Sequence, residues 1–175
     1  HLTLAVPPDV ASSLLESVAP AASAAVGSVR IAEIDTLILV FERSRLGVEE
    51  LAGLISVDGP FLSAVSRDFL DDEHYRGFAF HFPGGRYSEA ERLEAACRAI
   101  DSAPTDAAAV EHLANRLPAL RAGHAQTIQA LDAALAGNRI GVTGNWFLGV
   151  SIEDCVTRSR SEHERRFGAL ATAAA

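Results

Sequence analysis

The sequence predicts an α+β fold, in which a mixed β-sheet carries flanking helices. The chain has 175 residues, of which 49% are hydrophobic, so it is long enough to bury a core. In residues 75–85, phenylalanines alternate with small or polar residues, which is the period of a half-buried strand. Ser88 followed by Glu91 forms a capping-box pattern, which predicts a helix directly after that strand.

The amino-terminal part is predicted to contain two strands and two helices. The letters LTLAV (2–6) predict a short strand, and Pro7-Pro8 predicts the turn that follows it. An alanine-rich second helix follows Pro20, and β-branched residues predict a buried strand at 35–41. The first helix is expected to bury a face formed by Val10, Leu14, Leu15 and Val18.

The remaining elements are predicted from turn and helix signals. Residues 62–70 read as a strand that pairs with the phenylalanine-rich strand as a hairpin. Residues 109–120 are strand-like, but Pro118 has no backbone N–H, which favours an edge strand or a broken strand. A helix at 125–135 is closed by Gly137-Asn138.

The composition argues against a nucleic-acid partner and against a membrane-spanning segment. The net charge is -8 and the pI is about 5.2, whereas nucleic-acid-binding proteins concentrate Lys and Arg. No apolar run approaches the roughly 20 residues that cross a bilayer, although peripheral membrane contact stays open. Cys97 and Cys155 match no metal-binding spacing and are interpreted as reduced packing residues, which fits a cytoplasmic protein. Because the first residue is not Met, we expect the chain to begin inside a longer protein.

Other site patterns are weak. The six histidines lack the spacing to further ligands that a metal site needs, so no metal site is predicted. No serine has His and Asp partners at a recognisable spacing, which gives a hydrolase triad no support. Residues 157–167 mix arginine with glutamate and are interpreted as a solvated helix face with i,i+3 and i,i+4 pairs.

The stretch 140–156 has the most site-like pattern. It reads as a strand, a Gly-Asn turn, an aromatic loop and a helix that starts near Ile152, with Ser151 and Asp154 at capping positions. The start of such a helix directs unpaired N–H groups at a phosphate, a carboxylate or an electron-rich ring edge. Spacing alone favours a plain strand-to-helix connection, with Trp146 and Phe147 in the core.

The wording of this stretch adds a family resemblance. The letters GNWFLGVSIEDCV (144–156) resemble the carboxyl-terminal flavin motif of the protoporphyrinogen oxidase branch of the flavin amine oxidase superfamily. Two other segments resemble further landmarks of that family in the same order, LTLAVPPDVASSLL (2–15) and LPALRAGHAQTIQALDAAL (117–135). The resemblance therefore spans nearly the whole chain.

The resemblance implies a substrate-binding lobe built on the mixed sheet, plus the last strand and helix of a Rossmann-like FAD-binding lobe. On this basis we expect FAD as the cofactor and a small-molecule substrate. The implied segments are a strand-turn-helix of the FAD lobe at 1–19, the substrate lobe at 20–120, the carboxyl-terminal FAD-lobe segment at 121–168 and a tail at 169–175.

The resemblance also implies site residues. Arg67 and Arg76 could meet a substrate carboxylate through the bidentate fork of a guanidinium, although a surface salt bridge is the plainer interpretation. His124 matches the family's Gly-His pair, although a packing role at a helix start is the plainer reading there too. Catalytic residues are not identified. The implied cofactor-binding residues act mostly through backbone groups at the pyrimidine edge of the flavin, and Trp146 is expected close to the ring or to the substrate entry. These residues are Gly144, Asn145, Trp146, Gly149, Val150, Ser151 and Ile152.

Three departures from the family pattern stand out. Ser151 replaces a glycine and Glu153 replaces a proline, so the Ser151 cap and the Asp154 carboxylate compete for donors that a flavin would use. Glu153 also opposes negative charge on a nearby ring. No GxGxxG follows a strand, so the amino-terminal dinucleotide-binding motif is absent from this chain.

The sequence therefore predicts the carboxyl-terminal part of an FAD-dependent oxidoreductase that moves a hydride from a porphyrinogen-type or related substrate to flavin. An amine oxidase or a carotenoid desaturase-like enzyme is the alternative among enzymes. A non-catalytic ligand-binding or assembly domain is the alternative of another class. We also expect this chain to form a homodimer, because association would cover apolar surface of an incomplete lobe.

Overall fold

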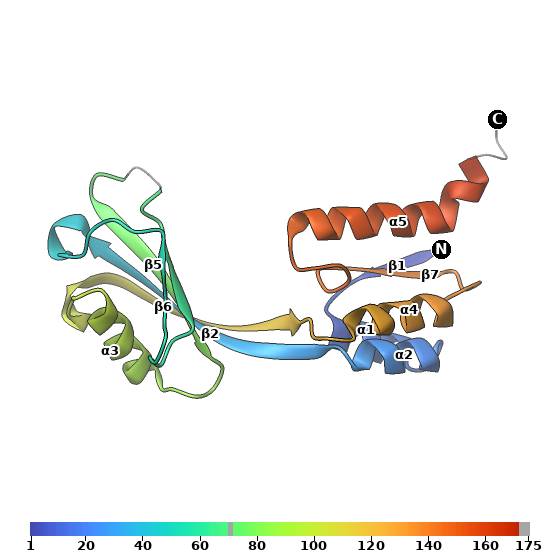
Figure 1. The fold of residues 1–175 in the computed structure, drawn as a ribbon, viewed down its shortest axis with the longest axis horizontal. Helices are drawn as coiled ribbons and strands as arrows, with labels where there is room; N and C mark the ends of the chain where they lie inside the picture. The colour runs from blue at the N-terminus through green and yellow to red at the C-terminus, as the bar shows by residue number, and fades with distance from the viewer. Residues whose placement is uncertain (70–71, 172–175) are drawn as a thin grey trace. The chain divides into compact units, whose positions relative to one another are not determined.

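The computed structural model describes residues 1–69 and 72–171, and it confirms the α+β class (Figure 1). The chain divides into two compact units, His1–Ile31 with Pro118–Ala175 (unit one) and Ala32–Leu117 (unit two). The second helix belongs to unit one. The assignment of residues 1–19, 20–120 and 121–168 to an FAD lobe and a substrate lobe stays a prediction. Of the expected tail at 169–175, residues 172–175 lie outside the described residues. Residues 169–171 belong to the last helix, which runs to Ala171.

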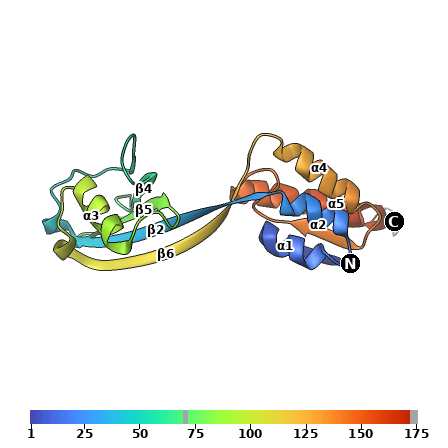
Figure 2. The ribbon, with the colours of Figure 1, turned by 90° about the horizontal axis from the view of Figure 1, so that it is seen from below.

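Unit one is a short parallel sheet between two layers of helices. Strand β1 (Leu2–Ala5) pairs in parallel with β7 (Ile140–Thr143), and Leu2 lies opposite Ile140. Figure 1 shows α5 on one side of this sheet and three helices on the other, and in Figure 2 α2 lies between the other two helices of that layer. The helices are α1 (Pro8–Leu15), α2 (Pro20–Gly27), α4 (His124–Ala134) and α5 (Ile152–Ala171).

The buried face of α1 differs from the prediction. Leu15 is fully buried, as predicted, and so is Ala11, whereas Val10, Leu14 and Val18 are exposed by 43%, 53% and 60%. Ala11 belongs to the same buried cluster as Ala22 and Val26 of α2.

Unit two is a five-stranded sheet covered by one helix. The strand order is β3-β4-β5-β2-β6, and neighbouring strands from β3 to β2 are antiparallel. β6 is an edge strand, which confirms the prediction from Pro118. The elements are β2 (Arg30–Glu42), β3 (Gly53–Ile55), β4 (Ser63–Ser66), β5 (Tyr75–Pro83), α3 (Glu89–Ala99) and β6 (Ala107–Ala119), with short 3-10 turns η1 (Arg43–Arg45) and η2 (Pro104–Asp106).

Period-2 alternation builds the core of unit two. Phe78, Phe80 and Phe82 of β5 are buried on one face, as predicted, and pack with α3. The predicted hairpin is also confirmed, because β4 pairs with β5 and Ala64 lies opposite Phe80. The capping box that starts α3 is present, with the Glu91 N–H donating to the Ser88 hydroxyl at 3.3 Å.

Candidate functional site

The loop between β7 and α5 begins with a backbone conformation that requires glycine. Gly144 has φ +152°, and a Cβ at this position would lie 2.8 Å from the indole nitrogen of Trp146. A side chain would therefore be strained and would collide with the indole. Asn145, next in the turn, is exposed.

The start of α5 is capped as the sequence predicts. The Ser151 hydroxyl accepts the Asp154 N–H at 3.1 Å and donates to the Asp154 carboxylate at 2.6 Å. The Ser151 N–H also donates to this carboxylate, at 3.2 Å. A Cβ at Gly149 would collide with the same carboxylate, so the tight capping box favours glycine there. Ser151 and Asp154 are therefore occupied with each other.

The capping box leaves two donors free. Within the described residues, no acceptor contacts the backbone N–H of Ile152 or Glu153, which are the first two residues of α5. The side chains of Val150 and Ile152 are exposed by 63% and 85% beside them. The structure thus brings the predicted residues Val150, Ser151 and Ile152 together as one exposed, mainly apolar edge with free N–H groups.

Trp146 and Phe147 lie in the core, as the spacing of the sequence predicts. Its side chain is fully buried and stacks on Phe147 with ring centroids 4.1 Å apart. Its indole N–H donates to the carbonyl oxygen of Val6 at 3.1 Å. The Trp146 side chain is therefore inaccessible in this chain and anchors the loop to the end of β1, while its closeness to a bound ring or to the substrate entry stays a prediction.

His124 supports the same loop. Its Nε2 lies 2.6 Å from the Trp146 carbonyl oxygen, and because a carbonyl oxygen only accepts, Nε2–H is the donor. His124 and the Val6 carbonyl thus hold Trp146 from two sides. This is the packing role at a helix start that the sequence offered as the plainer interpretation.

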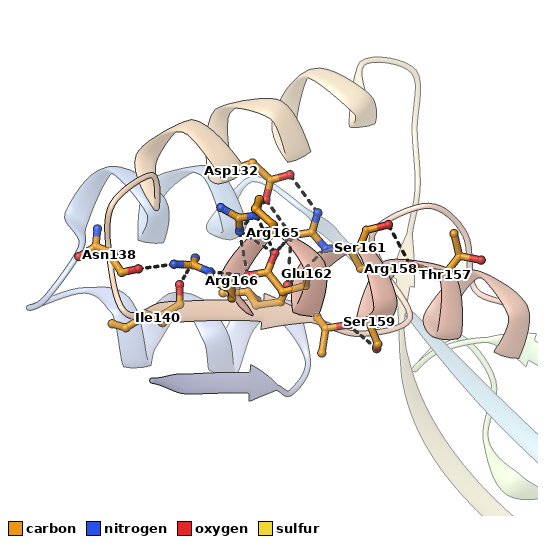
Figure 3. Close-up of polar contacts among 12 residues, drawn as sticks. Asp132, Asn138, Ile140, Thr157, Arg158, Ser159, Ser161, Glu162, Arg165 and Arg166 are labelled. Carbon is orange, nitrogen blue, oxygen red and sulfur yellow. Dashed lines mark hydrogen bonds and ion pairs between the residues drawn. The ribbon is translucent and has the colours of Figure 1, made fainter. Parts of the chain in front are cut away.

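A buried charge network lies under the second half of α5 (Figure 3). Glu162 is buried and binds Arg158 at 3.2 Å, Arg165 at 2.6 Å and Arg166 at 2.9 Å. Arg158 also binds Asp132 of α4 at 2.7 Å. The predicted i,i+3 and i,i+4 pairs are present, but the interpretation of this face as solvated is wrong for Arg158 and Glu162, which point inwards.

The same network fastens α5 to β7. Arg158 donates to the carbonyl oxygen of Val142 at 3.2 Å, and its guanidinium carbon lies 4.0 Å from the ring centroid of Phe147. Arg166 donates to the carbonyl oxygens of Asn138 and Ile140 (Figure 3). These contacts fix the helix whose start forms the exposed edge.

In unit two, Arg76 is buried and bound to protein groups. Its side chain is 3% exposed and its guanidinium donates to both carboxylate oxygens of Asp68, at 2.8 and 2.7 Å. It also donates to the carbonyl oxygens of Val48 and Glu49. These hydrogen bonds from Arg76 lower the pKa of Asp68 below its ordinary value of 3.8. The expected role of Arg76 in substrate binding is therefore not supported, whereas Arg67 is exposed.

Sequence reasoning missed a polar group on the other face of the sheet. The Thr36 hydroxyl lies 3.1 Å from Nδ1 of His81 and accepts the amide N–H of Asn115 at 2.9 Å. Strand alternation places these side chains opposite the phenylalanine face, together with the half-exposed Val65 and Leu113. The polar position of His81 between phenylalanines was the available signal, but Thr36 and Asn115 are distant in sequence.

The described residues contain no cluster of three or more His, Cys, Asp or Glu that could hold a metal ion. None of their helices is long and apolar enough to cross a membrane. Cys97 is buried, and burial raises the pKa of its thiol.

Comparison with known proteins finds the same fold in solved structures. No protein-family model matches the sequence, and no curated protein matches it. Among solved structures, a protein from Exiguobacterium sp. 255-15 provisionally assigned as a protoporphyrinogen oxidase matches 92% of this chain and 39% of its own, with a TM-score of 0.66 and 15% identity.

Two further structures show the same fold. Reduced UDP-galactopyranose mutase matches 94% of this chain and 41% of its own, with a TM-score of 0.63 and 12% identity. A putrescine oxidase double mutant, redesigned in its cofactor binding, matches 93% and 42%, with a TM-score of 0.56 and 11% identity. The chain thus spans about two fifths of the length of these structures.

Proposed function

We propose that this chain is the carboxyl-terminal part of an FAD-dependent oxidoreductase. The observation that carries the proposal is the start of α5, where two free N–H groups follow the carboxyl end of β7, a strand that runs parallel to β1. Ligands of open α/β sheets bind outside the carboxyl ends of their strands. The sequence motifs and the fold shared with the solved structures support the same proposal.

The donors at the start of α5 fit the electron-rich edge of a flavin ring. The N–H groups of Ile152 and Glu153 would meet the ring edge, and the exposed side chains of Val150 and Ile152 would contact its apolar surface. The carboxylate of Glu153 lies in the first turn, where it weakens the positive field of the helix. FAD, when bound, would accept a hydride from the substrate, while this chain would supply position and electrostatics.

Unit two would supply the substrate-binding surface. Thr36, His81 and Asn115 form a hydrogen-bonded group on a sheet face that also carries the apolar side chains of Val65 and Leu113, which suits a ligand with an apolar body and a polar group. We propose a porphyrinogen-type or related substrate, with an amine or a carotenoid-like substrate as the alternatives.

A non-catalytic binding domain is the second candidate function. The observation that favours it is the capping box of Ser151 and Asp154, which uses donors and charge that a cofactor would otherwise meet. An enzyme and a binding domain differ in whether the natural protein carries flavin, which absorbance of the purified protein measures.

The decisive experiment removes one of the free donors without disturbing the helix. Proline at the first helical position is tolerated because its N–H has no partner there, so Ile152→Pro should delete a donor and keep α5. In the longest natural protein that contains this chain, we expect Ile152→Pro to lower the flavin reduction potential. Ile152→Ala is the matched control, because it removes the side chain and keeps the N–H.

The expected size follows from hydrogen-bond strength. A hydrogen bond to a charged group contributes about 1.5–3 kcal/mol, which corresponds to about 30–65 mV for a two-electron couple. A natural protein that carries no flavin, or equal potentials in the proline and alanine variants, would contradict the proposal.

A further inference from the structure

A hollow of about 270 Å³ lies beside the first turn of α4 and is formed entirely by unit one. Its walls come from the residues that follow α2, the first residue of β2, the last residue of β6, and the loop and first turn of α4. The polar side chains that line it are those of Ser28, Arg30, Arg121, His124 and Thr127. This volume is smaller than that of a typical pocket for a drug-sized ligand, so it suits a single small group.

The hollow carries positive charge in an acidic protein. The whole chain has a net charge of -8, yet no Asp or Glu lines the hollow and two arginines do. Among the described residues, neither Arg30 nor Arg121 has an ion-pair or hydrogen-bond partner. In the Glu162 network, by contrast, the arginines are paired with carboxylates. Because guanidinium groups stay charged at any ordinary pH, the two arginines are free to bind an anion.

Two further side chains in the hollow have hydrogen-bonding groups to offer. His124 is held by the hydrogen bond from its Nε2–H to the Trp146 carbonyl, and its Nδ1 makes no hydrogen bond with the described residues. The Thr127 hydroxyl likewise has no hydrogen-bond partner among them. The ring of His124 is thus fixed in place by the buried Trp146 anchor, next to the arginines.

We propose that this hollow binds the anionic group of a small molecule, a carboxylate or a phosphate, through Arg30 and Arg121. Arginine forks bind both groups through paired, charge-assisted hydrogen bonds. The binding needs no flavin and no residue at the start of α5. The proposal therefore goes beyond the proposed function and can fail without it.

Titrating the purified chain with inorganic pyrophosphate and, separately, with succinate tests the proposal. Amide NMR shifts of Gly123 and Thr127 report the hollow, and calorimetry gives Kd. We expect saturable binding of at least one anion, and the tighter one shows whether phosphate or carboxylate is preferred. Arg30→Gln and Arg121→Gln should each raise Kd about tenfold, equivalent to about 1.4 kcal/mol.

Arg160→Gln is the matched control, because Arg160 is an exposed arginine of the same unit that lies outside the hollow. It removes the same charge and should leave Kd within about twofold, since an exposed charge acts only weakly at a distance in salt. Amide spectra of each variant verify that it is folded. The proposal is overturned if neither anion gives a saturable shift at millimolar concentration, or if Arg160→Gln weakens binding as much as the two hollow variants.

Discussion

Replacing Arg76 should destabilise unit two rather than weaken ligand binding. Both partners of the Arg76–Asp68 pair are nearly inaccessible, with side chains 3% and 5% exposed. Arg76→Gln removes two hydrogen bonds to the carboxylate and those to the carbonyl oxygens of Val48 and Glu49. Loss of one partner from a buried pair costs about 3–5 kcal/mol, because the other charge stays buried without compensation. We expect the lower end, since Asp68 keeps the Leu51 N–H at 3.1 Å.

The same pair predicts how stability depends on pH. The pKa of Asp68 is lowered in the folded chain, chiefly by the hydrogen bonds from Arg76. The unfolded chain therefore takes up this proton at a higher pH than the folded chain does. The stabilisation is fully present above the unfolded pKa, near 3.8, and is lost as the pH falls through the folded pKa. Asp68→Asn should remove this part of the acid sensitivity.

Because the chain has two compact units, the assay must report unit two by itself. Hydrogen exchange of the β5 amides does so across a urea series at neutral pH and at pH values below the ordinary Asp pKa. Arg67→Gln is the control, since this exposed neighbour should change stability by only about 0.5 kcal/mol. A cost below about 1 kcal/mol for Arg76→Gln would refute the reasoning, because it would mean that the pair is not buried as described.

Three further predictions concern unit one. Gly144→Ala should lower the free energy of unfolding, measured by heat or urea, by about 1–3 kcal/mol, because a residue with a Cβ is strained at φ +152° and its Cβ collides with the Trp146 indole. An unchanged stability would contradict that geometry. Ser151→Ala should cost about 1 kcal/mol by removing the cap of α5, while Ser161→Ala, on the exposed face of the same helix, should cost less. Leu14→Glu should reduce the self-association of this chain, measured by light scattering, because Leu14 belongs to the exposed apolar face of α1. A strictly monomeric mass for the unmodified chain would argue against this expectation.

Local patterns predicted the elements of this fold because their causes are local. The alternation in β5 and the capping boxes at Ser88 and Ser151 depend on residues two or three positions apart. Pro118 favoured an edge strand because a residue without a backbone N–H cannot donate a hydrogen bond to a neighbouring strand on that side, whichever strand it would be. The order of elements and the fold class therefore followed from the sequence.

Partner choice could not be predicted in this way. Arg76 pairs with Asp68 rather than with a ligand, and Trp146 donates to Val6, which is 140 residues away in the chain. Thr36 meets Asn115, which is 79 residues away, only because β2 and β6 are neighbours in the sheet. Sequence patterns predict whether a residue lies in a helix or a strand and on which face, but not which distant residues the fold places beside it.

The sequence by itself determined the α+β class, the start of the last helix and the family resemblance, since each rests on short-range spacing or on a stretch of consecutive letters. Only the tertiary structure decided which of the predicted site residues are accessible. It buried Arg76, left Val150 and Ile152 exposed, and brought the arginines of the hollow together from segments far apart in the chain. Burial and charge at a site are properties of packing between distant segments, and for that reason the sequence alone could not supply them.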